Sequence, residues 1–294
     1  MVLLKEYRIC MPLSVEEYRI GQLYMIARHS LEQTESGNGV EIVENKECED
    51  PQHGKGQFTE KRIHLNGRLP YWLQAVLPSV FYITEKAWNY YPYTVTEYTC
   101  SFLPKFCITI QTTYENNSGT SENALNLSVE VLKTRIVDHV DIVYDEVSAK
   151  HYKEEEDLKF FKSKKTGRGP LAEDWRTSVT PIMCSYKVVQ ASFEIWGLQS
   201  RAEELIQSSI REILLVGHKQ AFAWIDSWID MSLDDVRAYE KSAHEETNDK
   251  LGPTAAQPST PGSKFGTPSE TPSGTPPASP RTPASAVKSW FSWS

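Results

Sequence analysis

Residues 84–107 read TEKAWNYYPYTVTEYTCSFLPKFC, and this stretch decides the fold that we expect. Aromatic and β-branched residues fill it from position 90 to position 100, which predicts a β-strand. From Tyr93 onward the residues alternate between two faces, and each face mixes hydroxyl groups with bulky side chains. Such a wall suits a cavity that holds an amphiphile. It also suits a half-exposed strand with threonines in water, and this stretch alone leaves both interpretations open.

The chain divides into two parts of different composition. In residues 251–294, 24 of the 44 residues are Pro, Ser or Thr. Such a segment buries too little apolar surface to offset its conformational entropy, so we expect a disordered regulatory tail. Residues 1–250 form the expected folded domain. This domain is acidic, because the whole chain has a net charge of −8 and the tail is slightly basic. Acidic domains bind nucleic-acid phosphates poorly, so no nucleic-acid partner is expected.

Several classes of protein are disfavoured by what the chain lacks. Its five cysteines never form a CxxC pair, and its seven histidines show no HxxxH or HxH spacing, so we expect no metal site. Charged residues interrupt the apolar start MVLLKEYRIC, and no run of 18 apolar residues occurs. These features predict a soluble, reduced, cytoplasmic protein. Catalytic signatures such as GxSxG are missing, so an enzyme is not expected.

Hydrophobic periodicity gives the order of the expected elements. Strands are predicted at residues 2–10, 56–65, 106–114, 136–143 and 183–196, and helices at about residues 14–30, 198–229 and 231–250. Ser14 and Glu17 form a capping-box signature at the start of the first helix. A strand, a helix, several antiparallel strands and a long C-terminal helix predict a curved sheet that grips a helix around an interior tunnel.

Two polar features lie on predicted strand faces. Lys187 shares its face with Met183, Val189 and Ala191, so its ammonium needs a route to water or an anionic partner. Thr59 and Lys61 share a face of an earlier strand, hydroxyl beside ammonium. Solvent explains both features, and so does a lipid headgroup with its phosphate at Lys187.

Two other segments have alternative interpretations. Residues 68–80, RLPYWLQAVLPSV, place Trp72 in an apolar run between prolines, which suits either the core or a membrane-facing patch. Residues 161–171, FKSKKTGRGPL, lack the order of a phosphate-binding loop. Their basic cluster suits a solvated loop or an anionic membrane. Ser163 in this segment is a candidate phosphorylation site.

Many of these stretches together resemble the phosphatidylinositol transfer proteins. The matching motifs are LLKEYRI, GQLY, GVE, GQFTEKR, EKAWNYYPY, FKSKKTGRGPL, CSYK and WGLQ, in the family's order across about residues 1–250. ICMPL, PIMCSYK and GHKQAFAW are most similar to the soluble class II branch, the retinal-degeneration-B beta type. The resemblance implies an α+β fold: a large, concave, mostly antiparallel sheet whose long helices enclose a cavity for a single lipid, as in a START-like helix-grip.

The resemblance also implies a headgroup site. Inositol contacts fall on Thr59, Lys61, Glu85, Asn89 and Glu240, phosphate contacts on Gln22, Thr96, Thr112 and Lys187, and membrane-docking residues on Trp72, Ile195 and Trp196. Thr94 stands where classical members have a cysteine linked to holding phosphatidylcholine. This difference favours phosphatidic acid as the second lipid and leaves phosphatidylcholine open. Ile195 replaces the first of two docking tryptophans.

The implied function is a non-enzymatic carrier without cofactor. It binds one phosphatidylinositol, and phosphatidic acid as a second cargo, and moves them between membranes, on which it is peripheral. A sterol carrier is disfavoured because a sterol needs no anion partner for Lys187. The other alternative is a lipid-sensing signalling adaptor that acts through a phosphorylated tail.

The tail has sequence features of its own. It repeats Thr-Pro and Ser-Pro dipeptides, one of them at Thr282, and Arg281 precedes Ser285. Thr282 and Ser285 are therefore candidate phosphorylation sites. Soluble class II relatives have a tail that binds 14-3-3 proteins once phosphorylated, so the resemblance implies such a partner. A passive solubilising tail is the alternative.

Overall fold

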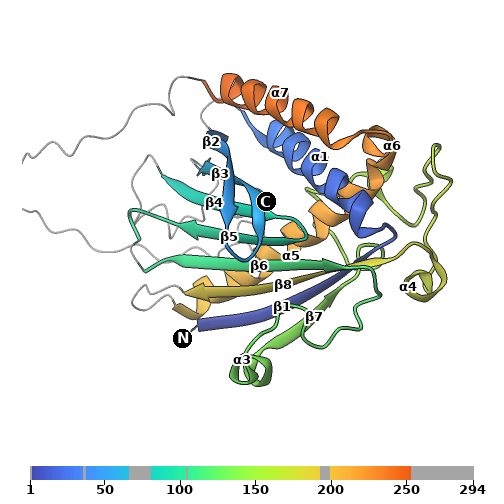
Figure 1. Ribbon diagram of the computed structural model, residues 1–294, viewed down its shortest axis with the longest axis horizontal. Coiled ribbons are helices and arrows are strands. Elements are labelled where there is room, and N and C mark those ends of the chain that lie inside the picture. Colours follow the sequence, from blue (N-terminus) through green and yellow to red (C-terminus); the bar gives the residue numbers. More distant parts are fainter. Residues whose placement is uncertain (1, 36–37, 66–80, 104, 193–198, 253–294) are drawn as a thin grey trace, which may run out of the picture.

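The computed structural model describes residues 2–35, 38–65, 81–103, 105–192 and 199–252, which form one sheet with its packed helices (Figure 1). Its strands are β1 (Val2–Met11), β2 (Gly39–Asp50), β3 (Gly54–His64), β4 (Tyr82–Tyr90), β5 (Tyr93–Thr99), β6 (Cys107–Glu115), β7 (Ile136–Val140) and β8 (Met183–Ser192). Its helices are α1 (Val15–Gln33), α3 (Val129–Thr134), α4 (Trp175–Ser178), α5 (Gln199–Ala223), α6 (Ile225–Trp228), α7 (Leu233–Leu251) and the 3-10 turn η1 (Glu154–Glu156). The α+β class and the strand-helix-sheet-helix order predicted from the sequence are confirmed.

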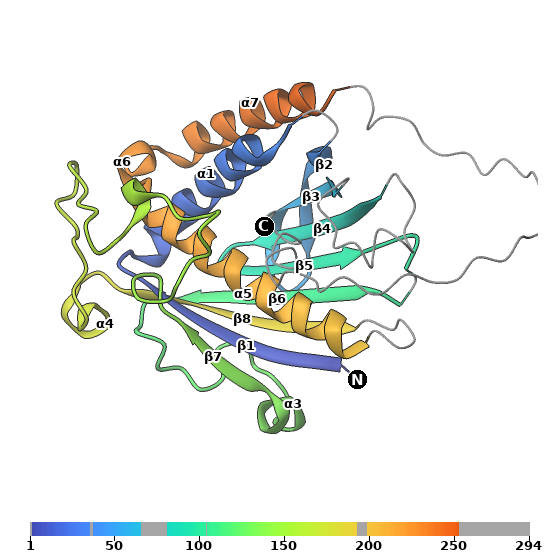
Figure 2. The same ribbon diagram turned by 180° about the vertical axis from the view of Figure 1, so that it is seen from behind.

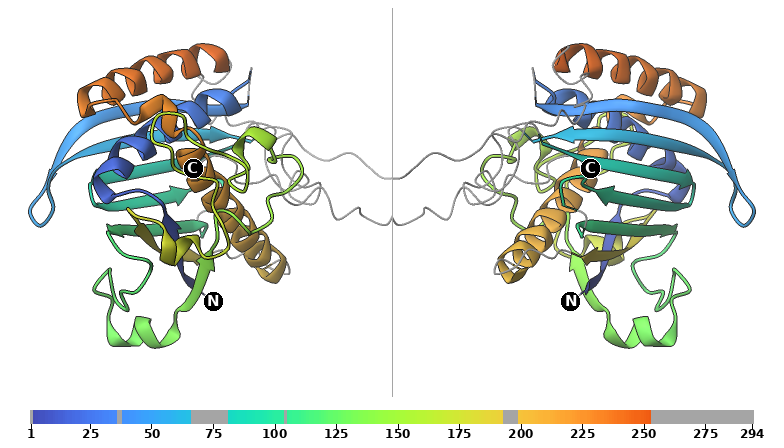
Figure 3. Two further views of the ribbon diagram at one scale, coloured as in Figure 1. Left: turned by 90° about the vertical axis from the view of Figure 1, so that its right-hand side faces the viewer. Right: turned by 90° about the vertical axis from the view of Figure 1, so that its left-hand side faces the viewer.

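The eight strands form a single sheet in the order β2-β3-β4-β5-β6-β8-β1-β7. All neighbours are antiparallel except β1 and β7, which run parallel. The sheet is curved, and its β2–β3 end bends toward α1 and α7 (Figure 3). Helix α5 crosses the sheet in the view of Figure 2, while α1 and α7 lie together above it. The mostly antiparallel sheet gripping a long helix is therefore as expected.

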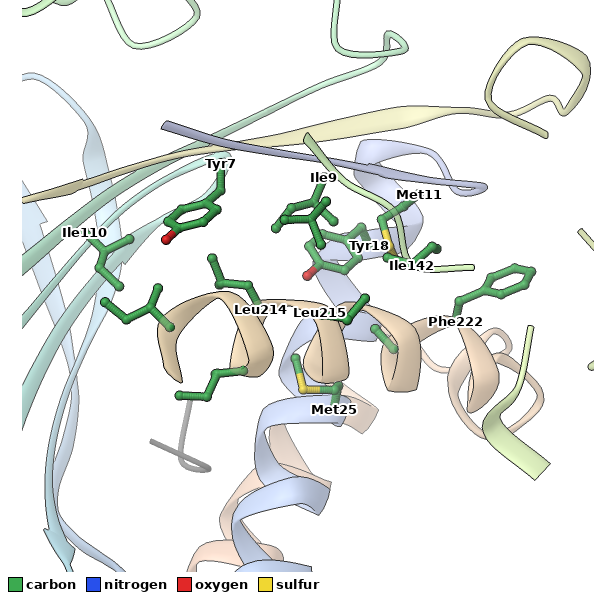
Figure 4. Close-up of a cluster of buried hydrophobic side chains, with 14 of the residues drawn as sticks. Tyr7, Ile9, Met11, Tyr18, Met25, Ile110, Ile142, Leu214, Leu215 and Phe222 are labelled. Atoms are coloured by element: carbon green, nitrogen blue, oxygen red, sulfur yellow. The ribbon is translucent and has the colours of Figure 1, made fainter. Parts of the chain in front are cut away.

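The main core lies between β1 and helix α5. Tyr7, Ile9 and Met11 alternate along β1 toward Leu214, Leu215 and Phe222 of α5, with Tyr18 and Met25 of α1 beside them (Figure 4). These side chains are buried. Alternate positions of a strand point to one face, so β1 presents an apolar row to the helix. Burying this row fixes α5 across the sheet.

Helix α1 begins where the sequence predicts. The Ser14 side chain accepts from the Glu17 backbone N–H at 3.2 Å, and the Glu17 carboxylate accepts from the Ser14 N–H at 2.9 Å. This is the predicted capping box. One turn later Gly21 lies against Trp228, where an added Cβ would come within 2.7 Å of the indole ring. The missing side chain therefore lets α1 and α6 pack closely.

The stretch at residues 90–100 is not the single strand that we expected. Strand β4 ends at Tyr90, a cis Tyr91–Pro92 peptide makes the turn, and β5 begins at Tyr93, which pairs with Tyr90. Proline has no N–H to donate to a sheet, so it interrupts a strand at this position. Tyr91 stacks on Tyr114, with ring centroids 5.2 Å apart, and its hydroxyl donates to the Val15 carbonyl. The turn is thereby tied to the start of α1.

The long helix predicted at residues 198–229 is also divided. Helix α5 ends at Ala223, and Trp224, with φ −94° and ψ 13°, leaves the helical conformation before α6. The Trp224 indole N–H donates to the buried Glu156 carboxylate at 3.1 Å. The break therefore coincides with a contact between Trp224 and the distant η1 segment. The predicted C-terminal helix is confirmed as α7, where Ser232 and Asp235 form a second capping box.

Candidate functional site

A cavity of about 150 Å³ lies between the sheet and helices α1, α5 and α7. Its wall includes all nine residues assigned to the headgroup: Gln22, Thr59, Lys61, Glu85, Asn89, Thr96, Thr112, Lys187 and Glu240. They come from α1, five strands and α7, so the fold gathers them from distant parts of the chain. Thr94 and Tyr98 of β5 also face this cavity. The alternating hydroxyl wall around Tyr93 is therefore the wall of a cavity.

Lys187 projects from the middle of β8 into this cavity. Its ammonium donates to the Thr112 hydroxyl at 3.3 Å and lies 5.6 Å from the centre of the Tyr114 ring. Lys187 lines the cavity, and burial lowers its pKa to about 8. No carboxylate of the described residues forms an ion pair with it. This buried cation therefore favours an anionic ligand.

Tyr114 organises the polar groups beside Lys187. Its hydroxyl donates to the Gln22 side-chain carbonyl at 2.8 Å, which leaves the Gln22 amide N–H groups available as donors. The Tyr114 ring is held by Tyr91 on one side and by Tyr18 edge-on at 5.3 Å. Lys187, Gln22 and Thr112 thus offer hydrogen-bond donors at one end of the cavity. Donors from an ammonium, an amide and a hydroxyl suit a phosphate.

His218 of α5 borders the same end of the cavity. Its Nδ1 lies 2.7 Å from the Leu214 carbonyl, and its ring stacks on Tyr18. Burial, with the nearby Lys187 charge, lowers the pKa of His218 to about 3. The histidine is therefore neutral at physiological pH, and Lys187 remains the cationic group at this end.

The other end of the cavity is built on β3 and β4. Lys61 and Glu85 are opposite each other in the two strands and form an ion pair at 3.4 Å. They are only 5% and 4% exposed. One oxygen of Glu85 and the side-chain oxygen of Asn89 are buried without a partner among the described residues. Charged and amide groups with spare hydrogen-bonding capacity suit a ring rich in hydroxyls.

Helix α7 closes this end with a carboxylate. Glu240 accepts from the Arg237 guanidinium at 2.6 Å, and both side chains line the cavity. His244 follows one turn later. Burial, together with the nearby Lys61 charge, lowers the pKa of His244 to about 4, so the imidazole is neutral at physiological pH. Thr59 donates to the Asn45 side chain at 3.4 Å rather than to any of these groups.

The cavity opens into a wider cleft of about 1090 Å³ between α1, α7 and the β2–β3 pair. The two spaces share Gln22, Leu23, Gln57, Asn89, Arg237 and Glu240. Movement of α7 would therefore uncover the cavity from this side.

Three of these lining residues were not predicted from the sequence: Tyr114, His218 and Arg237. Arg237, Glu240 and His244 follow helical spacing along one face of α7, and this signal would have identified Arg237. Tyr114 appears in the sequence as one more aromatic residue of a strand face. His218 lies in a helix where apolar periodicity predicts core.

Five predicted residues lie outside the described part of the chain: Trp72, Ile195, Trp196, Thr282 and Ser285. Ser163 is described and buried, and its hydroxyl donates to the Asp226 carboxylate. Asp226 also accepts from the backbone N–H groups of Lys164 and Lys165. A kinase would reach Ser163 only after this loop has opened.

Two findings concern what the described residues lack. No helix among them is long and apolar enough to cross a membrane. Across the same residues, no group of three or more His, Cys, Asp or Glu side chains is arranged to hold a metal ion.

Comparison with known proteins identifies the family of this chain. The model of the phosphatidylinositol transfer protein family matches residues 2–245. The chain is 68% identical over 255 residues to cytoplasmic phosphatidylinositol transfer protein 1 of Drosophila melanogaster. The aligned region covers 87% of this chain and 93% of that protein. It is 59% identical over 251 residues to the Homo sapiens protein of that name, covering 85% and 75%. Membrane-associated phosphatidylinositol transfer protein 1 of Mus musculus is 44% identical over 246 residues, covering 82% of this chain and 20% of that protein. This chain belongs to the phosphatidylinositol transfer protein family.

Proposed function

We propose that this protein binds one phosphatidylinositol in its cavity and carries it between membranes, with the lipid phosphate at Lys187 and the inositol ring at Lys61, Glu85 and Asn89. The observation that carries the proposal is the buried ammonium of Lys187, which has donors around it and no carboxylate partner among the described residues. A phosphodiester supplies the missing negative charge and accepts hydrogen bonds from every one of these donors.

The second cargo that we propose is phosphatidic acid. Its headgroup is a phosphate alone, so it needs the Lys187 end of the cavity and makes no use of the Lys61–Glu85 end. Thr94 lines this cavity, and its hydroxyl is compatible with a small polar headgroup. Binding and release leave every covalent bond of the lipid unchanged, so the protein acts without catalysis and without a cofactor.

Transfer requires that the cavity open at a membrane. The cleft beneath α7 supports an opening in which this helix moves away and takes Glu240 from the headgroup. We propose that Trp72, Ile195 and Trp196 supply the apolar contact with the membrane, as the family resemblance implies. The protein would then be cytoplasmic and only transiently peripheral on membranes.

The test combines lipid analysis with a matched pair of variants. Mass spectrometry of lipid bound to the purified protein should find phosphatidylinositol, and the protein should transfer it between vesicles. Lys187→Met should reduce binding of every phospholipid by about tenfold or more, because it removes a charge-assisted hydrogen bond of about 1.5–3 kcal/mol. Lys86→Met is the control, since Lys86 lies next to Glu85 on the other face of β4 and pairs with Glu60.

Two results would contradict the proposal. Unchanged lipid binding in Lys187→Met would show that Lys187 reaches solvent and holds no phosphate. A protein that retains phosphatidylinositol but never transfers it would favour the lipid-sensing adaptor, which signals through a phosphorylated tail and a 14-3-3 partner.

A further inference from the structure

Cys10 of β1 and Cys184 of β8 lie directly opposite each other in the sheet. All five cysteines of the chain are described and are free thiols, and no other two occupy opposed positions of neighbouring strands. Opposed residues of antiparallel strands have Cα atoms about 4.5–5.5 Å apart, and disulfides join Cα atoms about 4.4–6.8 Å apart. The backbone register therefore already brings these two residues to bridging distance.

The two thiols lie on the face of the sheet that is turned away from the lipid cavity. Tyr7, Ile9 and Met11 point toward α5 (Figure 4), so Cys10 points the other way. In the same manner Lys187 faces the cavity, and Cys184, three positions earlier, faces away from it. An oxidation of these thiols would thus be separate from the headgroup site.

A loop that follows β6 covers both sulfurs. Arg8, two residues before Cys10, donates to the Gly119 carbonyl at 2.9 Å. Tyr186, two residues after Cys184, donates to the Asn117 side chain at 2.6 Å. Each strand therefore contributes one side chain that fastens the same loop over the pair.

Gly119 leaves a small space directly above the two sulfurs. A Cβ built on this glycine would lie 3.6 Å from the Cys10 sulfur and 3.6 Å from the Cys184 sulfur. Gly119 has φ +86°, a conformation that residues with side chains rarely adopt. The backbone at Gly119 thus lies against both thiols and carries no side chain there.

The surroundings also make the two thiols chemically unequal. The contact with Cys184 lowers the pKa of Cys10, and the same contact, with burial, raises the pKa of Cys184. Cys10 is therefore the more readily ionised of the two opposed thiols. A thiolate is the form that reacts with peroxides, and a neighbouring thiol can resolve the product.

We propose that Cys10 and Cys184 form a reversible oxidation site for hydrogen peroxide. The Cys10 thiolate attacks one peroxide oxygen, the O–O bond breaks, and the departing hydroxide takes up a proton, giving a sulfenic acid and water. The Cys184 sulfur then attacks the sulfenic sulfur, an S–S bond forms, and a second water leaves with the Cys184 proton. Two sulfurs are oxidised and one peroxide is reduced.

Peptide mapping of the full-length protein tests this directly. The folded protein is treated with hydrogen peroxide, free thiols are blocked with iodoacetamide, and the digest is analysed without reduction. We expect a cross-linked peptide joining Cys10 to Cys184, which dithiothreitol restores to two thiols. Cys48, Cys100 and Cys107 should remain alkylated. Protein unfolded in urea before oxidation should instead give mixed pairings.

The variants assign the two roles. Cys184→Ser should leave Cys10 as a sulfenic acid that dimedone traps, whereas Cys10→Ser should leave Cys184 reduced at the same peroxide dose. Cys48→Ser is the matched control and should form the cross-link as the parent protein does. Oxidation of Cys10 to the sulfinic acid with Cys184 still free in the parent protein would overturn the proposal. A first cross-link between any other two cysteines would also overturn it. Both results are measured on the parent protein, so they do not depend on whether a variant folds.

Discussion

Lys187 has an ammonium group in a wall of hydroxyls and aromatic rings, and this places its titration near neutral pH. Its pKa is lowered to about 8 in the described structure because burial penalises the charged form. A bound phosphate would favour the charged form and raise that pKa again. Phospholipid binding above pH 8 would therefore be coupled to uptake of one proton.

The affinity for phosphatidylinositol should accordingly fall as pH rises through about 8, by about tenfold per pH unit until the lysine of the complex also titrates. The affinity falls because Lys187 of the free protein loses its proton at a lower pH than Lys187 of the complex. Binding above pH 8 must therefore put this proton back. Binding measured by a fluorescent-lipid displacement assay between pH 7 and pH 10 would show the slope. In Lys187→Met the slope should vanish, and a slope that persists in this variant would assign the titration to another group.

Thr59 lies beside the Lys61–Glu85 pair, so it tests the inositol end alone. In Thr59→Glu a second carboxylate enters the site where Glu85 already lies, and phosphatidylinositol transfer should fall by about tenfold or more, equivalent to roughly 1.4 kcal/mol. Phosphatidic acid has no ring to place there, so its binding should survive. Vesicle transfer of each lipid measures the difference. Thr59→Ser, which retains the hydroxyl, is the control, and an equal loss of both lipids in Thr59→Glu would contradict the assignment.

The parts of the candidate site that could be predicted are those where a polar side chain stands out on one face of a single strand. Lys187 appeared as a charged residue on an apolar strand face, and Thr59 and Lys61 appeared as neighbours two positions apart. Both signals follow from the period of two along a strand. Tyr114 was missed because its role comes from a contact with Gln22, which lies on another element and is distant in sequence. Arg237 was missed although its spacing from Glu240 on one helix was visible in the sequence.

Among the elements, α7 is hydrogen-bonded to the sheet through Asn248, near the C-terminal end of the helix. The Asn248 amide accepts from the Ile42 backbone N–H at 2.8 Å and donates to the Ile42 carbonyl at 3.0 Å. Ile42 lies at a register shift of the edge strand β2, where its backbone groups are free to bond this side chain. Asn248 therefore holds the helix that contributes Glu240 to the cavity.

Asn248→Ala should loosen α7 without touching the headgroup. Losing two hydrogen bonds of about 1 kcal/mol each shifts the opening equilibrium by about tenfold or more. Hydrogen exchange should speed up at the Ile42 amide and in α7, and lipid release into acceptor vesicles should become faster. Asp249→Ala, at the exposed neighbouring position, serves as the control. Unaltered exchange in Asn248→Ala would show that other contacts hold the helix.

The starts of capped helices were predicted well from the sequence, whereas breaks within predicted helices and strands were not. Ser14 and Ser232 fix the starts of α1 and α7 through local hydrogen bonds, which the sequence displays. Helix α5 ends just before Trp224, whose indole bonds to Glu156 in a contact between distant segments. The β4–β5 turn was marked by Pro92, yet the aromatic run on both sides outweighed that signal. Local rules thus locate helix starts, while breaks made by distant partners need the fold.

At the scale of the whole molecule, the tail should be separable from the carrier. Among the described residues, all those that line the cavity precede position 241, and the Pro-, Ser- and Thr-rich segment begins ten positions later. Deleting residues 253–294 should leave phosphatidylinositol transfer between vesicles within about twofold of the full chain, a difference below about 0.5 kcal/mol. Partner binding or localisation in cells should change instead. Loss of transfer in vitro would show that the tail belongs to the carrier.

The strand order has a consequence for how the protein is made. Strand β1 leaves the ribosome first, yet its antiparallel partner β8 begins only at Met183. Until β8 is synthesised, the edges of β1 and β6 that it joins have no partner to pair with. Pairings this distant in sequence are slow to form. Strand β8 also carries Lys187, so the pairing that closes the sheet is the same step that brings this lysine to the cavity.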